Sequence, residues 1–454
     1  MITSIFVNGY KSLTDFRLDI QPGLSVLVGP NGSGKSNILS LFEFLSHASK
    51  YSLAEAVSRS GGAGALFTRR KDQEISNSFA VEITGYGRQS ANKRQIRYGG
   101  RPSHSGEYHV EYKYSATVTL SDKGSKLLYT DQRLCFSVFS HPDARSRTNR
   151  ATGEKRWHVD IVTQVDQLGN RSLRRNKINK PALKKVLGSS FYPIEPFHVT
   201  YLFDVATHSL FSVLRGYLAP SAKIYNDVAS GYVYNLNPSA IKQPEDVARA
   251  AEISEDGSGL AATLFSIQEN ERAGPGRFGF VDIDEDKPKV SIDQLKEMFC
   301  LINDNITDVR VENNALENKL IVIASVKGAS GKIDIPLTML SDGTVKWFAL
   351  VTAVLRENAI FSLEEPENYL HPYMQREVVE ILRRSASGSS ERFSLMTTHS
   401  ESLLNALDPA EVVAVSMKEG QTVAIRSKFA EELREEIARS GFGLGHFYVS
   451  GAIE

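Results

Sequence analysis

The chain has 454 residues, enough for two or three domains with a large buried core, and 41% of them are hydrophobic, as in soluble globular proteins. Lysine plus arginine and aspartate plus glutamate each total 53, so the formal net charge is zero, which argues against a protein that coats nucleic acid uniformly but leaves room for local basic patches. Two cysteines exclude a disulfide framework and a four-cysteine zinc site, and without a signal-peptide pattern or a membrane-spanning apolar run we expect a cytoplasmic protein with no membrane contact.

The first twenty residues predict two strands joined by a turn. Apolar and polar residues alternate over 2–7 and 16–20, and Asn8-Gly9 between them is a turn dipeptide. Tyr10 and Lys11 follow this turn, where they either face a nucleotide or are ordinary solvated residues.

The next segment has the spacing of a phosphate-binding loop. An apolar run at 24–28 predicts a buried strand, residues 37–45 have helical spacing, and Gly29-Pro30-Asn31-Gly32-Ser33-Gly34-Lys35-Ser36 lies between them. Glycines let the backbone turn tightly, so that its N–H groups and the helix dipole form an anion site. Lys35 would pair with the β- and γ-phosphates and the Ser36 hydroxyl would bind Mg²⁺; the alternative is a glycine-rich turn that binds nothing. The nucleotide-binding residues predicted here are Asn31, Gly32, Ser33, Gly34, Lys35 and Ser36.

A β-rich region with basic linkers follows. Strands are predicted over 79–84, 108–120, 126–129, 134–139 and 157–165. Basic residues crowd the linkers, first from Arg88 to Arg101 and again from Arg145 to Lys185. They would contact nucleic-acid phosphates, or else they are solvated loops or a face for an acidic protein partner.

Helical spacing returns over 191–290. Residues 237–241 predict a turn, 246–253 and 259–271 predict helices, and Ser258 is the expected N-cap of the second helix. No heptad pattern is sustained before residue 341, so a long coiled-coil arm is not expected.

From residue 291 the pattern is that of an α/β protein again. We expect an amphipathic helix over 292–303 and a β-meander made of 309–311, 319–326 and 332–337. Leu340-Ser341-Asp342-Gly343-Thr344 then opens another helix, where Ser341 and Gly343 either bind an anion at the helix N-terminus or serve as an ordinary cap.

Two further strands are predicted to end in polar residues. The run Ile360 to Leu363 is followed by Glu364, which would hold Mg²⁺ through water, and Glu365, which would polarise the attacking water. The strand at 393–397 leads to His399, which would contact a γ-phosphate or that water. The alternatives are a solvated acidic loop and a structural histidine, and His371 is interpreted as structural, as a cap or a packing residue.

These segments resemble the ABC/SMC/RecF group of P-loop ATPases. More narrowly, the chain resembles AAA-type ATPases related to OLD-family proteins, which are common in bacterial anti-phage systems. Residues 29–36 correspond to Walker A, 340–344 to the signature motif, 360–365 to Walker B, 365–370 to the D-loop and His399 to the switch histidine. Further marks of the narrower family are found at 237–240, 256–260 and 441–445.

The resemblance implies an α/β fold, an ABC/RecF-like head with an antiparallel β lobe and a helical insertion. The parts would be 1–190 (Walker A and the basic lobe), 191–290 (mainly helical) and 291–454 (signature, Walker B and switch histidine). ATP and Mg²⁺ are the implied cofactors. Signature residues of one head would complete the nucleotide site of another in a homodimer or higher homo-oligomer. The prediction also requires that the loop with Lys35 and the acidic residue Glu365 meet around one triphosphate.

The chain also departs from the family pattern. Walker B carries Glu364 where aspartate is usual, the signature has Asp342 where glycine is common and Thr344 where glutamine is common, and the Q-loop glutamine is not identifiable. The Toprim nuclease domain of OLD proteins is not evident, so a nuclease effector would be a separate protein.

Three functions therefore compete. The first is an ATPase that acts as sensor or scaffold in phage defence and controls a separate effector, such as a Toprim or other nuclease. The second is a RecF-like DNA-repair or DNA-clamping ATPase, which the basic lobe favours. The third, the soluble subunit of a transporter, fits the basic insertion and the Leu370-His371-Pro372 sequence poorly.

Overall fold

A computed structural model describes residues 1–69, 75–90, 107–121, 126–140, 155–165, 171–178, 204–215, 219–273, 290–329, 331–356, 360–387, 391–427 and 429–451. Its internal contacts divide the chain into two compact units, both discontinuous in sequence. The first unit contains Met1–Pro22, Gly29–Gly231 and Val415–Ala424, and the second contains Gly23–Val28, Tyr232–Ala414 and Ile425–Glu454. The three parts predicted from the sequence, 1–190, 191–290 and 291–454, divide the chain by function and not by contacts, so they stay a prediction.

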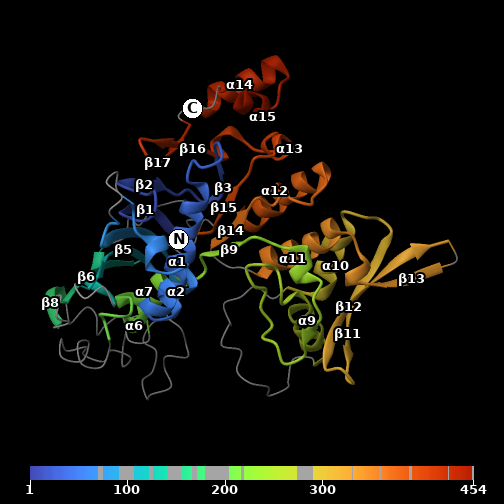
Figure 1. Ribbon diagram of the computed structural model, residues 1–454, viewed down its shortest axis with the longest axis horizontal. Helices are drawn as coiled ribbons and strands as arrows, with labels where there is room; N and C mark the ends of the chain where they lie inside the picture. Colours follow the sequence, from blue (N-terminus) through green and yellow to red (C-terminus); the bar gives the residue numbers. More distant parts are fainter. Residues whose placement is uncertain are drawn as a thin grey trace. The chain divides into compact units, whose positions relative to one another are not determined.

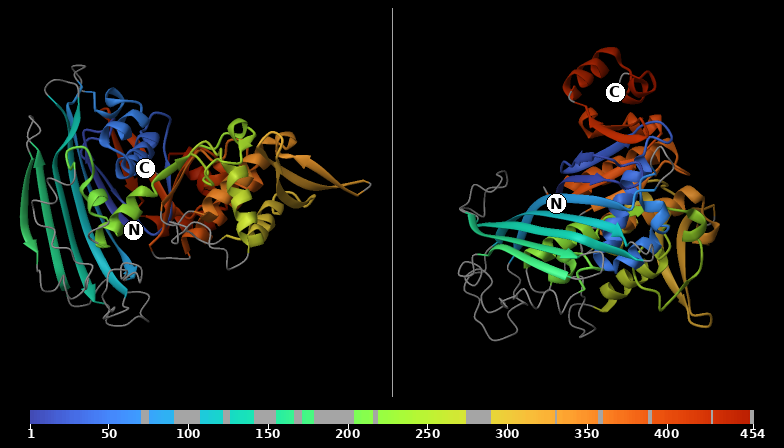
Figure 2. Two further views of the ribbon diagram at one scale, coloured as in Figure 1. Left: turned by 90° about the horizontal axis from the view of Figure 1, so that it is seen from below. Right: turned by 60° about the vertical axis from the view of Figure 1, so that its left-hand side comes forward.

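The first unit contains a seven-stranded antiparallel sheet, whose long strands lie side by side in the blue-to-green part of Figure 2. Its spatial order is β2-β1-β4-β5-β6-β7-β8. The strands are β1 (Ile2–Asn8), β2 (Phe16–Asp19), β4 (Ser78–Ser90), β5 (Glu107–Leu120), β6 (Leu127–Ser140), β7 (Lys155–Val165) and β8 (Arg171–Ile178). The predicted N-terminal hairpin and antiparallel β lobe are confirmed.

Two predictions about this lobe are wrong. The strands expected at 126–129 and 134–139 are a single strand, β6. Its pairing with β5 shifts from Thr117–Asp131 to Val118–Tyr129, which leaves residue 130 as a bulge. The bulge interrupts the alternation of apolar and polar residues, so the sequence pattern indicated two strands. Residues 171–178, expected in a basic linker, form strand β8 at the sheet edge, where charged residues are common because they discourage further strand pairing. The other basic residues of 91–106, 141–154 and 179–203 lie outside the described part.

The first unit also contains helices, one of which contributes Phe44 to an aromatic cluster. The helices are α1 (Lys35–Lys50), α2 (Leu53–Arg59), α3 (Ala63–Leu66), α6 (Leu210–Leu214) and α7 (Ala219–Ala229). Tyr10, Phe44 and Phe79 make mutual ring contacts at centroid distances of 5.5–5.9 Å. Tyr10 is fully buried and donates a hydrogen bond to the Ser40 carbonyl at 3.0 Å, and Lys11 Nζ donates to Ser40 Oγ at 2.8 Å. Tyr10 is therefore a core residue.

The second unit is built on a mainly parallel sheet with the order β17-β16-β3-β15-β14-β9 (Figure 1). Its strands are β3 (Gly23–Val28), β9 (Tyr232–Tyr234), β14 (Ile360–Glu364), β15 (Phe393–Thr397), β16 (Val412–Lys418) and β17 (Gln421–Arg426), of which residues 415–424 are grouped with the first unit. β3, β9, β14, β15 and β16 pair in parallel. Helices α11 (Asp342–Arg356) and α12 (Pro372–Ser387) supply buried residues to the same core, with α12 packed on β3.

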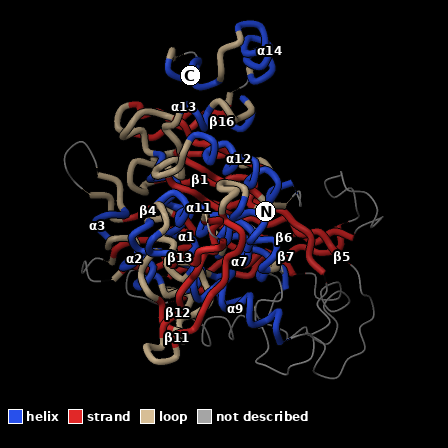
Figure 3. The backbone as a smooth tube through the Cα atoms, turned by 90° about the vertical axis from the view of Figure 1, so that its right-hand side faces the viewer, coloured by secondary structure: helices blue, strands red, loops and turns tan. Residues whose placement is uncertain are grey.

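A smaller antiparallel sheet completes the second unit. It contains β10 (Glu245–Asp246), β11 (Ile306–Asn314), β12 (Lys319–Gly328) and β13 (Gly331–Pro336), which confirms the predicted meander. Figure 3 shows the long β11–β12 pair, and α9 (Leu260–Ala273) packs on it. The remaining helices are α8 (Pro238–Ile241), α10 (Ile292–Cys300), α13 (Glu401–Leu404), α14 (Ala430–Ser440) and α15 (Leu444–Val449).

The sequence misassigned the start of this sheet. The helix expected over 246–253 is absent from this fully described stretch, because Glu245 and Asp246 pair with β12 and the Asp246 side chain accepts from the Ala248 N–H at 2.9 Å, which forms a turn. Ser258 is not the cap of α9. The buried Glu245 carboxylate accepts the Gly259 N–H and, at 2.9 Å, the Ala262 N–H, so a side chain from another element satisfies the helix N-terminus.

We expect Glu245→Ala to lower the free energy of unfolding by about 1–3 kcal/mol, because two buried N–H groups of α9 would lose their acceptor. Urea denaturation followed by circular dichroism measures this loss. Ser258→Ala is the matched control and should cost about 0.5 kcal/mol or less, since its hydroxyl bonds only exposed side chains. If Ser258→Ala lowered the free energy of unfolding more than Glu245→Ala does, Ser258 would be the N-cap of α9 after all.

These elements form the predicted α/β fold class, with an antiparallel β lobe and helices. In the described part of the chain, no helix is both long and apolar enough to cross a membrane.

Candidate nucleotide site

The phosphate-binding loop leaves β3 and enters α1, as the sequence predicts. Gly32 and Gly34 have φ of +78° and +102°, a region that side chains strongly disfavour. A Cβ on Gly34 would lie 1.9 Å from Thr422 Oγ1, and one on Gly29 would lie 2.0 Å from the Val415 carbonyl oxygen. Glycine is therefore required at 29 by close approach of neighbouring atoms, and at 34 by both close approach and backbone conformation.

The loop presents groups that suit an anion. Lys35 is 6% exposed, and its Nζ donates to the carbonyl oxygens of Gly29 and Pro30 at 2.8 and 3.0 Å, which holds the ammonium over its own loop. Ser33 Oγ is buried and has no hydrogen-bond partner among the described residues. Asn31, Gly32 and Ser36 are exposed at the same turn. A phosphate would give the serine hydroxyl an acceptor, and its negative charge suits the lysine ammonium, so these residues fit the predicted ligand.

Hydrogen bonds tie this loop to the rest of the first unit. Asn37 Nδ2 donates to Ser12 Oγ at 2.7 Å, Ser12 Oγ lies 2.6 Å from Thr422 Oγ1, and the Thr422 N–H donates to the Ser12 carbonyl at 2.9 Å. Thr422, the residue that approaches Gly34, is thus held from the β1–β2 turn. None of these supporting residues was predicted, because they are distant in sequence and carry no motif.

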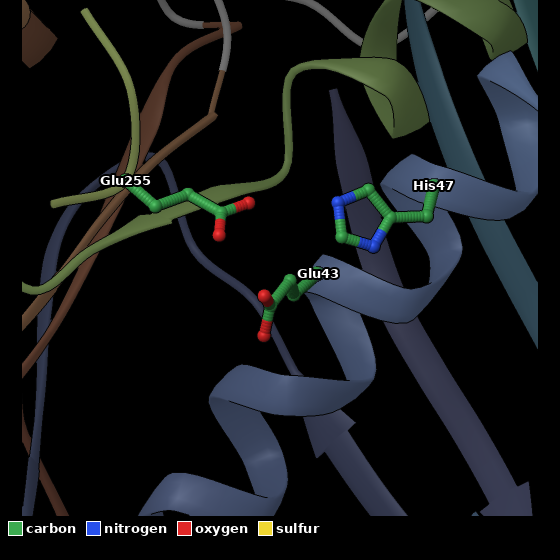
Figure 4. Close-up of side chains that lie close together, drawn as sticks. All are labelled: Glu43, His47 and Glu255. Carbon is green, nitrogen blue, oxygen red and sulfur yellow. The ribbon is translucent and has the colours of Figure 1, made fainter. Parts of the chain in front are cut away.

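Helix α1 also carries two titratable residues that lie apart from the loop. Figure 4 shows Glu43 and His47 on successive turns of this helix. Glu43 is eight residues beyond Lys35, about 12 Å along the axis at the usual rise. The two side chains therefore do not belong to the phosphate-binding end.

The second unit brings the acidic residues to the end of β14. Glu364 is the last residue of this strand, and Glu365 follows with φ of +42°, an unusual conformation for a residue with a side chain. The Glu365 N–H donates to Thr397 Oγ1 at 3.2 Å, and Asn368 Nδ2 donates to Glu365 Oε2 at 3.3 Å. Strained backbone of this kind persists where its surroundings hold it and clusters at functional sites.

His399, predicted to contact a γ-phosphate or the attacking water, lies beside Glu365. His399 Nε2 is 3.7 Å from Glu365 Oε1, close to it but longer than a hydrogen bond. Glu367 Oε1 accepts from the His399 N–H at 2.7 Å and from Thr398 Oγ1 at 2.8 Å. The loop after β15 is therefore fastened to the loop after β14.

Asn235 is a site residue that sequence reasoning missed. It follows β9, which pairs with β14, and its Nδ2 donates to Glu364 Oε2 at 3.4 Å. This strand is only three residues long, so no periodicity revealed it. The β-forming Tyr232-Val233-Tyr234 sequence was the available signal. Asn235 therefore stands at the end of the strand beside Walker B.

The signature segment begins α11. Ser341 Oγ accepts from the Thr344 N–H at 3.3 Å, so it caps the helix, which was the second of its two predicted roles. A Cβ on Gly343 would lie 2.7 Å from the Tyr369 carbonyl oxygen, so this glycine allows close contact with the D-loop region. Asp342, a departure from the family pattern, pairs with Lys242 at 2.6 Å.

His371 and the glycine-rich segment 441–445, two other features noted in the sequence, make structural contacts. His371 Nδ1 accepts from the Tyr373 N–H at 3.3 Å at the start of α12, which confirms the structural interpretation. In the glycine-rich segment 441–445, the Gly445 N–H donates to Asn405 Oδ1 at 2.7 Å, and a Cβ there would lie 2.4 Å from Glu401 Cγ. This segment packs against α13, which starts two residues after His399.

Two protein-domain families match the chain. Residues 231–405 match a family described as "AAA domain, putative AbiEii toxin, Type IV TA system", and residues 1–124 match one described as "AAA ATPase domain". The DNA replication and repair protein RecF of Corynebacterium jeikeium (strain K411) is 29% identical over 99 residues. That match covers 22% of this chain and 21% of RecF, so the chain spans about a fifth of the length of this relative. These similarities are to AAA ATPase domains and to a part of RecF.

Solved SMC heads also align with the chain. The SMC head bound to the C-winged helix domain of ScpA has a TM-score of 0.48 at 14% identity, covering 95% of this chain and 99% of that one. The SMC head domain of Thermotoga maritima has a TM-score of 0.37 at 11% identity, with coverages of 94% and 99%.

Proposed function

We propose that the chain binds ATP and hydrolyses it to ADP and phosphate as an ABC/RecF-like ATPase. The observation that carries this proposal is the surroundings of Glu365. Its backbone is in a strained conformation, one carboxylate oxygen accepts from Asn368, and the other faces His399. A carboxylate oriented in this way beside a histidine suits the activation of a water molecule.

The residues take the following roles. The loop 29–36 binds the phosphates, with Lys35 as the positive charge and Ser33 as a hydroxyl donor. Ser36 and Glu364 hold Mg²⁺, which when bound neutralises charge on the phosphates, and Asn235 orients the Glu364 carboxylate. Glu365 accepts the proton of the attacking water, and His399 contacts the γ-phosphate or that water.

The active form is a dimer or a larger oligomer of this chain. Ser341 and Gly343 of one copy complete the nucleotide site of its neighbour, as the resemblance implies. The exposed aromatic side chains of Tyr369 and Tyr373, which follow Walker B, support a protein interface near this end of the sheet.

The biological role we propose is that of a cytoplasmic sensor or scaffold in phage defence, which controls a separate effector such as a Toprim or other nuclease. The resemblance to OLD-related ATPases supports this role, and so does the toxin–antitoxin description of the family that matches residues 231–405.

Lys35→Ala is expected to abolish phage resistance, because a P-loop without its lysine cannot neutralise the nucleotide phosphates. The measurement is the plaque count of a phage panel on cells that carry the native locus. Lys296→Ala is a matched control, since that lysine pairs with Asp308 instead. If the Lys35→Ala variant is present at normal protein levels and the cells still resist phage, ATP binding is not needed for defence.

The alternative is a RecF-like ATPase that clamps or repairs DNA. The RecF match and the basic segments of the β lobe favour it. It predicts ATP-dependent DNA binding that weakens steeply as salt rises, because phosphate contacts release counterions. Fluorescence anisotropy of a labelled duplex at several salt concentrations tests this, and absent or salt-independent binding would reject the alternative.

A further inference from the structure

Helix α11 carries a charged residue in an unusually buried position. Lys346 is 2% exposed and lies five residues beyond Ser341, on the helix that the signature segment opens. Burying an ammonium is costly unless it gains specific partners, so its contacts call for an explanation beyond packing.

Those contacts lead to the loop after Walker B. Lys346 Nζ donates to the Asn368 carbonyl at 3.0 Å and lies 5.9 Å from the centre of the Tyr369 ring. Tyr369 has φ of +69°, and its carbonyl is the group that Gly343 approaches. The first turns of α11 therefore hold this loop at two consecutive peptide groups.

The same loop orients Glu365. The Asn368 N–H donates to the Glu365 carbonyl at 3.3 Å, and its side-chain Nδ2 donates to Glu365 Oε2 at the same distance. Asn368 thus binds Lys346 through its carbonyl and Glu365 through its amide. Only one residue separates the lysine from the carboxylate.

The charges around Lys346 agree with this geometry. Burial lowers the pKa of Lys346 to about 8, while the nearby carboxylates of Glu367 and Glu365 oppose that shift. Glu367 uses one oxygen to hold residues 398 and 399, and its other oxygen is buried without a hydrogen-bond partner among the described residues. The ammonium therefore lies close enough to these two acidic residues to interact with them electrostatically.

We propose that Lys346 is a positioning residue for ATP hydrolysis: through Asn368 it holds Glu365 in place and links that carboxylate to the signature helix. This inference rests on the proposed function, and it adds a coupling between two motifs that sequence reasoning treated as separate. A lysine that only filled space would be replaceable by an apolar side chain of similar length without any effect on turnover.

The test measures steady-state ATPase kinetics and nucleotide affinity of the full chain. Lys346→Met should lower kcat about tenfold or more while KM for ATP and the affinity for a fluorescent ATP analogue stay within twofold, because a small displacement of the base slows chemistry but leaves binding intact. Lys346→Arg keeps the charge and donors and should recover most of kcat. Lys296→Met is the matched control and should match wild type.

Asn368→Ala keeps the inference testable if Lys346→Met folds poorly. Asn368 is exposed, its carbonyl would remain for Lys346, and only its amide contact with Glu365 would be lost, so kcat should again fall with KM unchanged. Wild-type kcat in Asn368→Ala, or in well-folded Lys346→Met, would overturn the inference alone. Undiminished turnover in Glu365→Gln would instead remove Glu365 from its proposed role, and this inference with it. A wild-type chain that does not hydrolyse ATP would overturn the proposed function itself.

Discussion

Glu365→Gln is expected to bind ATP with near-normal affinity and to hydrolyse it roughly 10²–10⁴-fold more slowly, the range by which a general base usually contributes. Glutamine has almost the same shape and can still contact Asn368 and His399, but it cannot accept the proton of water. Because hydrolysis would no longer release the closed state, the variant should also accumulate as an ATP-dependent dimer or larger assembly.

Phosphate release measures the first effect, and light scattering after size-exclusion chromatography with and without ATP measures the second. Glu380→Gln is the matched control, since Glu380 pairs with Arg383 on α12 at 2.8 Å. It should behave as wild type in both assays. Unaltered turnover in Glu365→Gln would remove this residue from its role, and slow turnover without assembly would argue against an interface closed by nucleotide.

Gly34→Ala is expected to abolish ATP binding and to lower the free energy of unfolding by about 2–5 kcal/mol. The left-handed conformation at φ of +102° would cost about 1–2 kcal/mol for a residue with a Cβ, and overpacking against Thr422 adds about 1–3 kcal/mol. Isothermal titration with ATP and urea denaturation measure the two effects.

Gly32→Ala separates the cost of the left-handed backbone conformation from the cost of a steric clash with Thr422. Gly32 has a similar positive φ of +78°, but nothing lies within 4 Å of its missing Cβ, so this variant should lose only about 1–2 kcal/mol. A double-mutant cycle with Thr422→Ala should recover part of the Gly34→Ala loss, because the nearest clashing atom would be gone. Equal losses for both glycine variants and no recovery would show that the Thr422 contact is unimportant.

Much of the architecture was accessible from the sequence because its signals are local. The phosphate-binding loop depends on eight consecutive residues between a strand and a helix, and Walker B depends on an apolar run that ends at Glu364 and Glu365. Both patterns report a strand end, where functional groups collect. The long strands β5 and β7 were predicted for the same reason, from alternation along a single stretch.

The features that were missed depend on residues distant in the chain. Asn235 became a site residue only when β9 was seen beside β14, and Glu245 capped α9 from fourteen residues before Gly259. The bulge at residue 130 shifted the alternation by one position. In the sequence, Lys346 is one polar residue within an apolar helix. No sequence pattern indicates that its ammonium contacts the Asn368 carbonyl. Such relations are tertiary, so a single sequence does not encode them in its spacing.

The left-handed backbone at Glu365 has an evolutionary consequence. Glycine would relax that position, and asparagine would suit it better than glutamate does, so each replacement would make the resting protein more robust to heat. Selection for thermal stability alone would therefore favour replacement of this glutamate, and only selection for ATP turnover would preserve it. Descendants that have given up catalysis and serve as passive adaptors should reveal themselves by a glycine or an asparagine at this one position.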